Sequence, residues 1–190
     1  YYVDVMDAKV VRAFIDAAYQ PYYERFKGEI DGFFTDEPQV ARGGYPWSFI
    51  LDKEYKKHWG EDLKEHLSEL VNKCGNYKKT RMQFWKTVTD LFRESYFKQI
   101  YDWCEEKGYK LTGHLVLEDE IHSQLPSCGS AMAQYEYFHI PGMDWLGSKI
   151  FNCFTAKQLS SVVSQLGTED EVIISDDKPD GDTYAAIEPF

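Results

Sequence analysis

The stretch WCEEKGYKLTGHLVLED, residues Trp103 to Asp119, leads from the end of a helix into a strand and then into acids. Gly108 is typical of a residue that closes a helix, because glycine adopts a left-handed backbone without penalty. The alternation that follows predicts a strand from Lys110 to Leu117. One face of this strand carries a hydroxyl, an imidazole and a carboxylate, from Thr112, His114 and Glu118. A structural strand buries an apolar face, so this polar face indicates a functional one.

The rest of the chain repeats the alternation of helix and strand. Apolar residues at helical spacing predict helices over residues 7–26, 52–59, 62–73, 80–107 and 155–166. Strands are predicted over residues 30–35, 110–117, 135–140 and 171–175, with a loop over 123–130. Alternating strands and helices call for a parallel sheet with right-handed crossovers, as in a doubly wound sheet or a (β/α) barrel. The glycine fingerprint of dinucleotide-binding folds and the P-loop are absent from the sequence, which removes the usual cofactor-binding form of the doubly wound sheet.

Composition limits the class of protein and its partners. The chain has 190 residues, of which 43% are hydrophobic and 28% charged, as expected of a globular α/β domain with a sizeable core. The formal net charge of −11 repels phosphate backbones, so no nucleic-acid partner is expected. No apolar run reaches the ~20 residues that span a bilayer and no signal peptide opens the sequence, so no membrane partner is expected and the location is cytoplasmic or secreted. None of the four cysteines forms a CxxC pair, so neither a zinc knuckle nor a thioredoxin motif is present.

Acidic residues gather where the predicted strands end. The acids that follow or lie within the four predicted strands are Asp36 and Glu37, then Glu118, Asp119 and Glu120, then Glu136 and Asp144, and finally Asp176 and Asp177. The carboxyl ends of parallel strands lie at one edge of a sheet, so these side chains are expected to converge there. Crowded carboxyl groups titrate unequally, with one held protonated and another ionised. A general acid paired with a base or nucleophile needs that difference, and glycoside hydrolysis depends on it most.

Each of these features also has a structural explanation. The polar face of the strand before Glu118 could be a satisfied hydrogen-bond layer inside a barrel. The acids of TDEP, residues 35–38, could cap the next helix, and His139 could be a packed, hydrogen-bonded histidine. Aromatic residues beside the strand ends, among them Trp47 and Trp145, suit the apolar faces of sugar rings but also suit ordinary loop packing.

Three stretches together resemble the (β/α)8-barrel domain of α-L-rhamnosidase-like glycoside hydrolases, a family with many bacterial members. They are GFFTDEPQ (Gly32 to Gln39), WCEEKGYKLTGHLVLED and YEYFHIPGMDWLG (Tyr135 to Gly147), in the order that the family uses. The resemblance implies a TIM-type barrel in which they are the third, fourth and fifth strands, with the general acid Glu118 at the end of the fourth. A full barrel needs ~250 residues and eight strands. Residues 1–190 are therefore expected to form a single domain that is a partial barrel.

The leading hypothesis is a glycoside hydrolase that cleaves a plant or microbial glycan. Glu118 is the expected acid, with Glu37 or Glu136 as base or nucleophile. The side chains expected to bind the sugar are those of Asp36, His114, His139, Asp144, Trp47 and Trp145. The resemblance also allows a calcium ion near the site, and no other cofactor is expected.

Two other readings stay open. The same residues could bind carbohydrate without cleaving it, in a binding protein or an inactive fragment of a larger enzyme. A metal-dependent hydrolase with ligands His114, Glu118, Asp36 and His139 would lack the HxH and HExxH spacings typical of such enzymes. A partial barrel would also leave strand edges unpaired, which predicts association with a second copy.

Overall fold

The computed structural model describes residues 3–41, 43–145, 153–167 and 173–176. Four strands alternate with helices along this part of the chain: β1 (Gly32–Asp36), β2 (Lys110–His114), β3 (Ile140–Trp145) and β4 (Ile173–Asp176). The helical segments before β2 are α1 (Ala8–Phe14), η1 (Ile15–Tyr19), α2 (Gln20–Phe26), α3 (Leu51–Trp59), η2 (Leu63–His66), α4 (Leu67–Val71), α5 (Tyr77–Phe92), η3 (Arg93–Phe97) and α6 (Lys98–Lys107). Those after β2 are α7 (Ile121–Cys128), α8 (Ala131–Tyr135) and α9 (Phe154–Leu166).

The described strands form one parallel sheet in the order β1-β2-β3-β4. The register pairs Asp36 with His114 and Thr112 with Ile140. Because the strands are parallel, their carboxyl ends lie at one edge, which we call the rim. The predicted parallel sheet is confirmed, and the predicted TIM-type barrel is wrong: among the described residues β1 and β4 each pair with one neighbour, so the sheet is open. Alternating strands and helices are common to both architectures, and only the number and closure of the strands separates them.

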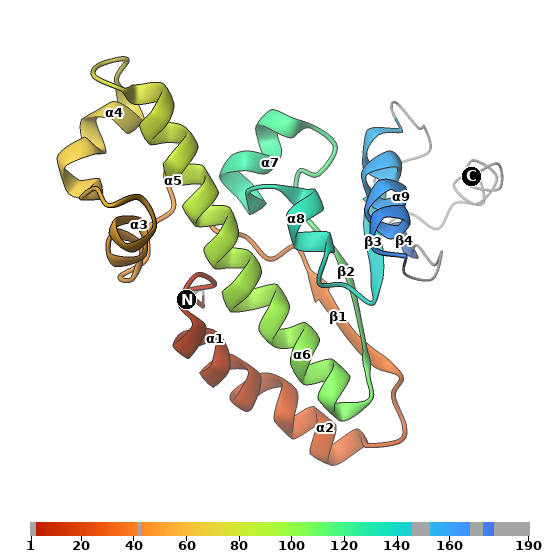
Figure 1. The fold of residues 1–190 in the computed structure, drawn as a ribbon. Helices are drawn as coiled ribbons and strands as arrows, with labels where there is room; N and C mark the ends of the chain where they lie inside the picture. Colours follow the sequence, from red (N-terminus) through yellow and green to blue (C-terminus); the bar gives the residue numbers. More distant parts are fainter. Residues whose placement is uncertain (1–2, 42, 146–152, 168–172, 177–190) are drawn as a thin grey trace.

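A long helical run, α5 to η3 to α6, is a major contributor to the core. Its buried face includes Phe84, Val88, Phe92, Ile100 and Trp103, and it ends at Gly108 with φ 76°. The predicted helix and its apolar stripe are therefore confirmed. Figure 1 shows α1 and α2 lying along this run, on the side away from α7. No helix in the described ranges is both long and apolar enough to cross a bilayer.

Three predicted elements differ in the structure. The expected loop 123–130 is mostly helix α7, and the expected strand 135–140 is the end of α8 and the turn before β3. The sequence YEYFHI alternates like a strand, but Tyr135 and Phe138 are buried side chains, and the Phe138 ring packs 5.3 Å from that of Phe97 on η3. The third difference is β2, which ends at His114 and not at Leu117. In residues 135–140, packing against residues far along the chain overrides the period-2 pattern of a six-residue segment.

Candidate functional site

The ends of β1 and β2 bring an aspartate and a histidine together at the rim. Asp36 lies opposite His114 in the register, and its Oδ1 is 3.5 Å from the His114 Nε2. The two strands approach closely because Gly113 has φ 147° and a Cβ there would overlap the Thr35 carbonyl. His114 is 5% exposed, with its ring edge-on to Phe34. Its Nδ1 is buried and has no hydrogen-bond partner in the part of the chain that the structure describes.

Two half-buried acids join this histidine. Glu37 follows β1 directly, and Asp144 lies on β3. One ligand atom each from Glu37, His114 and Asp144 lies within 4.8 Å of the others. We call these three residues the rim cluster. Glu37 has φ 45°, a left-handed conformation that costs a non-glycine residue on the order of 1 kcal/mol and is found most often at functional sites.

Glu118 reaches the same place from a turn and not from a strand. Leu117 has φ 54°, so the chain folds back after β2 and buries the Glu118 side chain, leaving the residue 4% exposed. Its Oε2 accepts hydrogen bonds from the Leu115 amide at 3.1 Å and from the Tyr135 hydroxyl, and its Oε1 accepts one from the Asp144 amide at 2.9 Å. The contact with the Asp144 amide therefore joins Glu118 to the carboxyl end of β3.

Burial sets the protonation of Glu118. Desolvation raises the pKa of this carboxyl to about 7; the Tyr135 and amide hydrogen bonds act in the opposite direction, and the negative charge of Asp144 adds to the rise. The Glu118 carboxyl therefore titrates near neutral pH, close enough to the Asp144 side chain to feel its charge. The sequence predicted an unequal pair of acids, but with Glu37 or Glu136 and not Asp144 as the partner of Glu118.

Two glutamines hold the Glu118 turn in place, and sequence reasoning missed both. The side-chain amides of Gln124 on α7 and Gln158 on α9 donate to the Glu118 carbonyl at 2.7 and 3.0 Å, and they also bond each other at 3.0 Å. Sequence reasoning also missed Tyr135 as a hydrogen-bond partner of Glu118. A residue far along the chain carries no local signal of which buried group it will meet.

Two of the predicted site residues lie away from the rim. Glu136 and His139 both precede β3, at the amino end of that strand. Glu136 pairs with Arg93 at 3.2 Å on the helical side. The His139 Nδ1 accepts from the Leu111 amide at 2.9 Å, and its Nε2 is 2.7 Å from Glu105. The expectation that these two side chains converge with Glu118 is wrong, because it depended on the strand 135–140.

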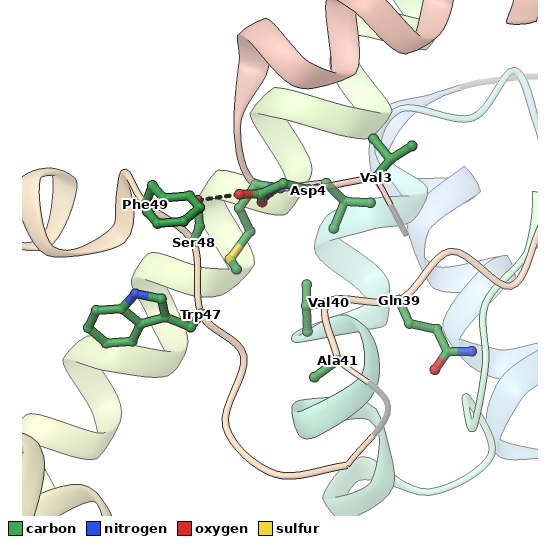
Figure 2. Close-up of a pocket in the computed structure, with 10 residues that line it drawn as sticks. Val3, Asp4, Gln39, Val40, Ala41, Trp47, Ser48 and Phe49 are labelled. Atoms are coloured by element: carbon green, nitrogen blue, oxygen red, sulfur yellow. Dashed lines mark hydrogen bonds between the residues drawn. The ribbon is translucent and has the colours of Figure 1, made fainter. Parts of the chain in front are cut away.

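Trp47 lines a pocket of about 340 Å³ in the loop that follows β1. Figure 2 shows Trp47 and Phe49 on one side of this pocket, with Val40 and Ala41 across it. The Ser48 hydroxyl donates to Asp4 at 2.7 Å, which ties the loop to the start of the chain. Trp47 is 48% exposed, so its ring is available to a ligand. The pocket begins close to the rim, since its lining includes Gln39, two residues after Glu37.

Three predicted strand-end residues, Trp145, Asp176 and Asp177, are only partly described by the structure or not at all. Trp145 ends β3 and Asp176 ends β4, as predicted for rim residues, but their side chains lie outside what the structure describes. Asp177 lies outside the described residues altogether.

The rim cluster fits a calcium ion poorly. Ca²⁺ takes six to eight oxygen ligands. The cluster supplies the carboxylates of Glu37 and Asp144, but its third member is the imidazole of His114. A nitrogen at the centre of the site does not match the hard oxygen shell of calcium.

Comparison with known proteins finds a likeness in fold. No family model and no curated protein matches the sequence. A solved rhamnosidase from Novosphingobium sp. PP1Y superimposes with a TM-score of 0.70 over 92% of this chain, at 19% sequence identity. The chain spans 17% of that rhamnosidase. At this identity the likeness shows a shared fold.

Proposed function

We propose that this chain belongs to a glycoside hydrolase of the rhamnosidase-like type and that it supplies the carboxyl groups that cleave the glycosidic bond. The observation that carries the proposal is the meeting of Glu118, Asp144 and Glu37 at the rim. The fold shared with part of a rhamnosidase supports the same reading.

Glu118 is the proposed general acid. Its carboxyl is protonated below a pH of about 7, so it can give a proton to the leaving glycosidic oxygen in neutral solution. Its hydrogen bonds to Leu115, Tyr135 and Asp144 hold the carboxyl in one orientation.

Glu37 is the proposed base or nucleophile. It is the other predicted catalytic carboxylate that lies at the rim, and one of its oxygens is within 4.8 Å of a ligand atom of Asp144, whose backbone amide binds Glu118. Asp36 and His114 would bind sugar hydroxyls beside it, and Trp47 would pack against a sugar or aromatic group in the adjoining pocket.

Replacing Glu118 and Glu37 by glutamine tests the proposal. We expect Glu118→Gln and Glu37→Gln each to lower kcat on an aryl glycoside by about 100-fold or more, because acid–base catalysis contributes factors of that order. The matched control is Glu136→Gln. It removes the charge of a glutamate at the other end of β3, away from the rim, and should leave kcat within about three-fold.

Far-UV circular dichroism and thermal unfolding show whether each variant folds. Wild-type activity in folded Glu118→Gln would remove Glu118 from the mechanism. If Glu118→Gln does not fold, Glu37→Gln decides alone, because Glu37 is partly exposed and accepts none of the hydrogen bonds that fix the turn.

A second function has one observation in its favour. Glu118 is 4% exposed and both its oxygens already accept hydrogen bonds, as expected of a structural carboxylate. The chain would then bind carbohydrate at the Trp47 pocket without cleaving it. A sugar-dependent change in tryptophan fluorescence that is lost in Trp47→Ala, with no turnover of any glycoside tested, would establish this function in place of the first.

A further inference from the structure

We propose that the rim cluster binds one transition-metal dication, of the Zn²⁺ or Co²⁺ class, through Glu37, His114 and Asp144. The inference goes beyond the proposed hydrolysis, because metal binding is measured without any substrate. It stands or falls whether or not the chain cleaves a glycoside.

The arrangement of donors is the first argument. The three ligand atoms lie within 4.8 Å of one another and come from the ends of three neighbouring strands. Ligands at about 2.0–2.2 Å from a zinc ion are about 3–3.5 Å apart in a tetrahedron, so small side-chain rotations close the site. One imidazole and two carboxylates suit Zn²⁺ and its neighbours in the first transition series, with water completing the shell.

The state of His114 is the second, independent argument. Its ring is 5% exposed, and among the described residues the Nδ1 atom has no partner. A buried polar atom without a hydrogen bond costs about 1–3 kcal/mol, so this nitrogen, in a side chain that belongs to the rim cluster, calls for a ligand. A metal ion meets that need at all times, whereas a sugar hydroxyl would meet it only while substrate is bound, and calcium prefers oxygen ligands.

The proposal assigns the His114 Nδ1 to the metal, and Asp36 then completes the arrangement from outside the cluster, at the other ring nitrogen. Its Oδ1 lies 3.5 Å from the His114 Nε2. A metal-bound histidine commonly donates its other ring N–H to a carboxylate, which fixes the ring and strengthens it as a ligand. Asp36 is therefore a positioning residue for the metal site.

Metal binding would compete with the proposed catalysis. A cation held by Glu37 removes the lone pair that a base or nucleophile needs. We therefore expect Zn²⁺ to inhibit hydrolysis and a chelator to restore it, in contrast to an enzyme that requires its metal.

The test is a titration of chelator-treated protein with Co²⁺ and Zn²⁺. Co²⁺ should produce visible absorption bands at about one ion per chain, and equilibrium dialysis should give the same stoichiometry for Zn²⁺. We expect His114→Phe and Glu37→Gln to weaken Zn²⁺ binding by about 100-fold, and Asp36→Asn to weaken it by about 10-fold. Ca²⁺ in large excess should not displace Co²⁺.

The matched control is His122→Ala. His122 also lies beside a carboxylate, with its Nε2 3.2 Å from Glu120, but its side chain is 81% exposed. This variant should bind Zn²⁺ as the wild type does. The proposal is overturned if Zn²⁺ binding is lost in His122→Ala, if it is unchanged in both His114→Phe and Glu37→Gln, or if Ca²⁺ displaces Co²⁺.

The outcomes also separate this inference from the proposed function. Metal binding at the cluster in a protein that hydrolyses no glycoside keeps the metal site and removes the glycosidase. Hydrolysis by a protein that binds neither Zn²⁺ nor Co²⁺ keeps the glycosidase and removes the metal site.

Discussion

The two ends of the sheet each hold a histidine beside a carboxylate, and the two histidines differ in what else they contact. At the amino end, His139 accepts from the Leu111 amide, pairs with Glu105 and stacks on Tyr101 at a ring distance of 4.1 Å. At the rim, His114 has Asp36 at 3.5 Å and an Nδ1 atom without a partner among the described residues.

The difference separates a histidine that the fold satisfies from one that the described residues leave with an unpartnered nitrogen. Both ring nitrogens of His139 are satisfied within the fold, and burial lowers its pKa, so the neutral ring serves as a brace between α6, β2 and the turn before β3. The His114 side chain is about as buried as that of His139, at 6% and 4% exposed, and yet its ring nitrogens have fewer partners among the described residues. Polar groups buried without partners are rare in native proteins and call for an explanation, which a ligand supplies.

The largest effect is expected from a change that separates β1 from β2. In Gly113→Ala the new Cβ would overlap the Thr35 carbonyl at a backbone with φ 147°, so we expect a loss of about 3–5 kcal/mol in the free energy of unfolding. Urea unfolding measures it. Gly60→Ala is the control, because Gly60 also has a positive φ of 76° but no atom lies within 4 Å of the new Cβ. Its expected cost is about 1 kcal/mol, and equal losses in the two variants would show that the strands do not approach closely.

Replacing each histidine by phenylalanine tests the comparison directly. His139→Phe keeps the ring on Tyr101 but leaves the Leu111 amide without its acceptor, so the free energy of unfolding should fall by about 1–3 kcal/mol while kcat changes little. His114→Phe removes a nitrogen that has no described partner, so we expect a stability change within about 1 kcal/mol and a fall in kcat of about 10-fold or more. Denaturant unfolding and steady-state kinetics measure both. If His114→Phe proved the less stable of the two and His139→Phe the less active, the assignment of the two ends would be reversed.

The smallest effect is a shift in a pH profile. Glu118 must be protonated to act as an acid, so hydrolysis should decline as the pH rises through about 7. The Tyr135 hydroxyl stabilises the ionised carboxylate, and Tyr135→Phe should therefore raise the pKa of Glu118 and move this decline to higher pH. The profile is measured on aryl glycoside hydrolysis in chelator-containing buffer, with Tyr137→Phe, at the amino end of β3, as the control. A shift to lower pH, or an equal shift in both variants, would contradict the role of Tyr135.

Some of this site could be predicted from the sequence. Asp36 and Glu37 after the first strand and the polar face that carries His114 and Glu118 were predicted, and the structure places these residues at the rim. Trp47 was also predicted beside the strand ends, and it lines the pocket in the loop that follows β1. Glu136 and His139 were predicted at the same place wrongly. Their segment alternates like a strand, and only the burial of Tyr135 and Phe138 makes it a helix end and a turn.

The sequence alone determined the local order: the long amphipathic helix that ends at Gly108, the parallel strands and the acids that follow them. These depend on backbone periodicity and on residues whose conformational preferences are local. The tertiary structure decided that the sheet of the four described strands is open, that Glu118 is buried beside Asp144 and that Gln124 and Gln158 hold its turn. Strand closure, burial and the partner of a buried polar group are set by contacts between residues far apart in the chain, and no local pattern encodes them.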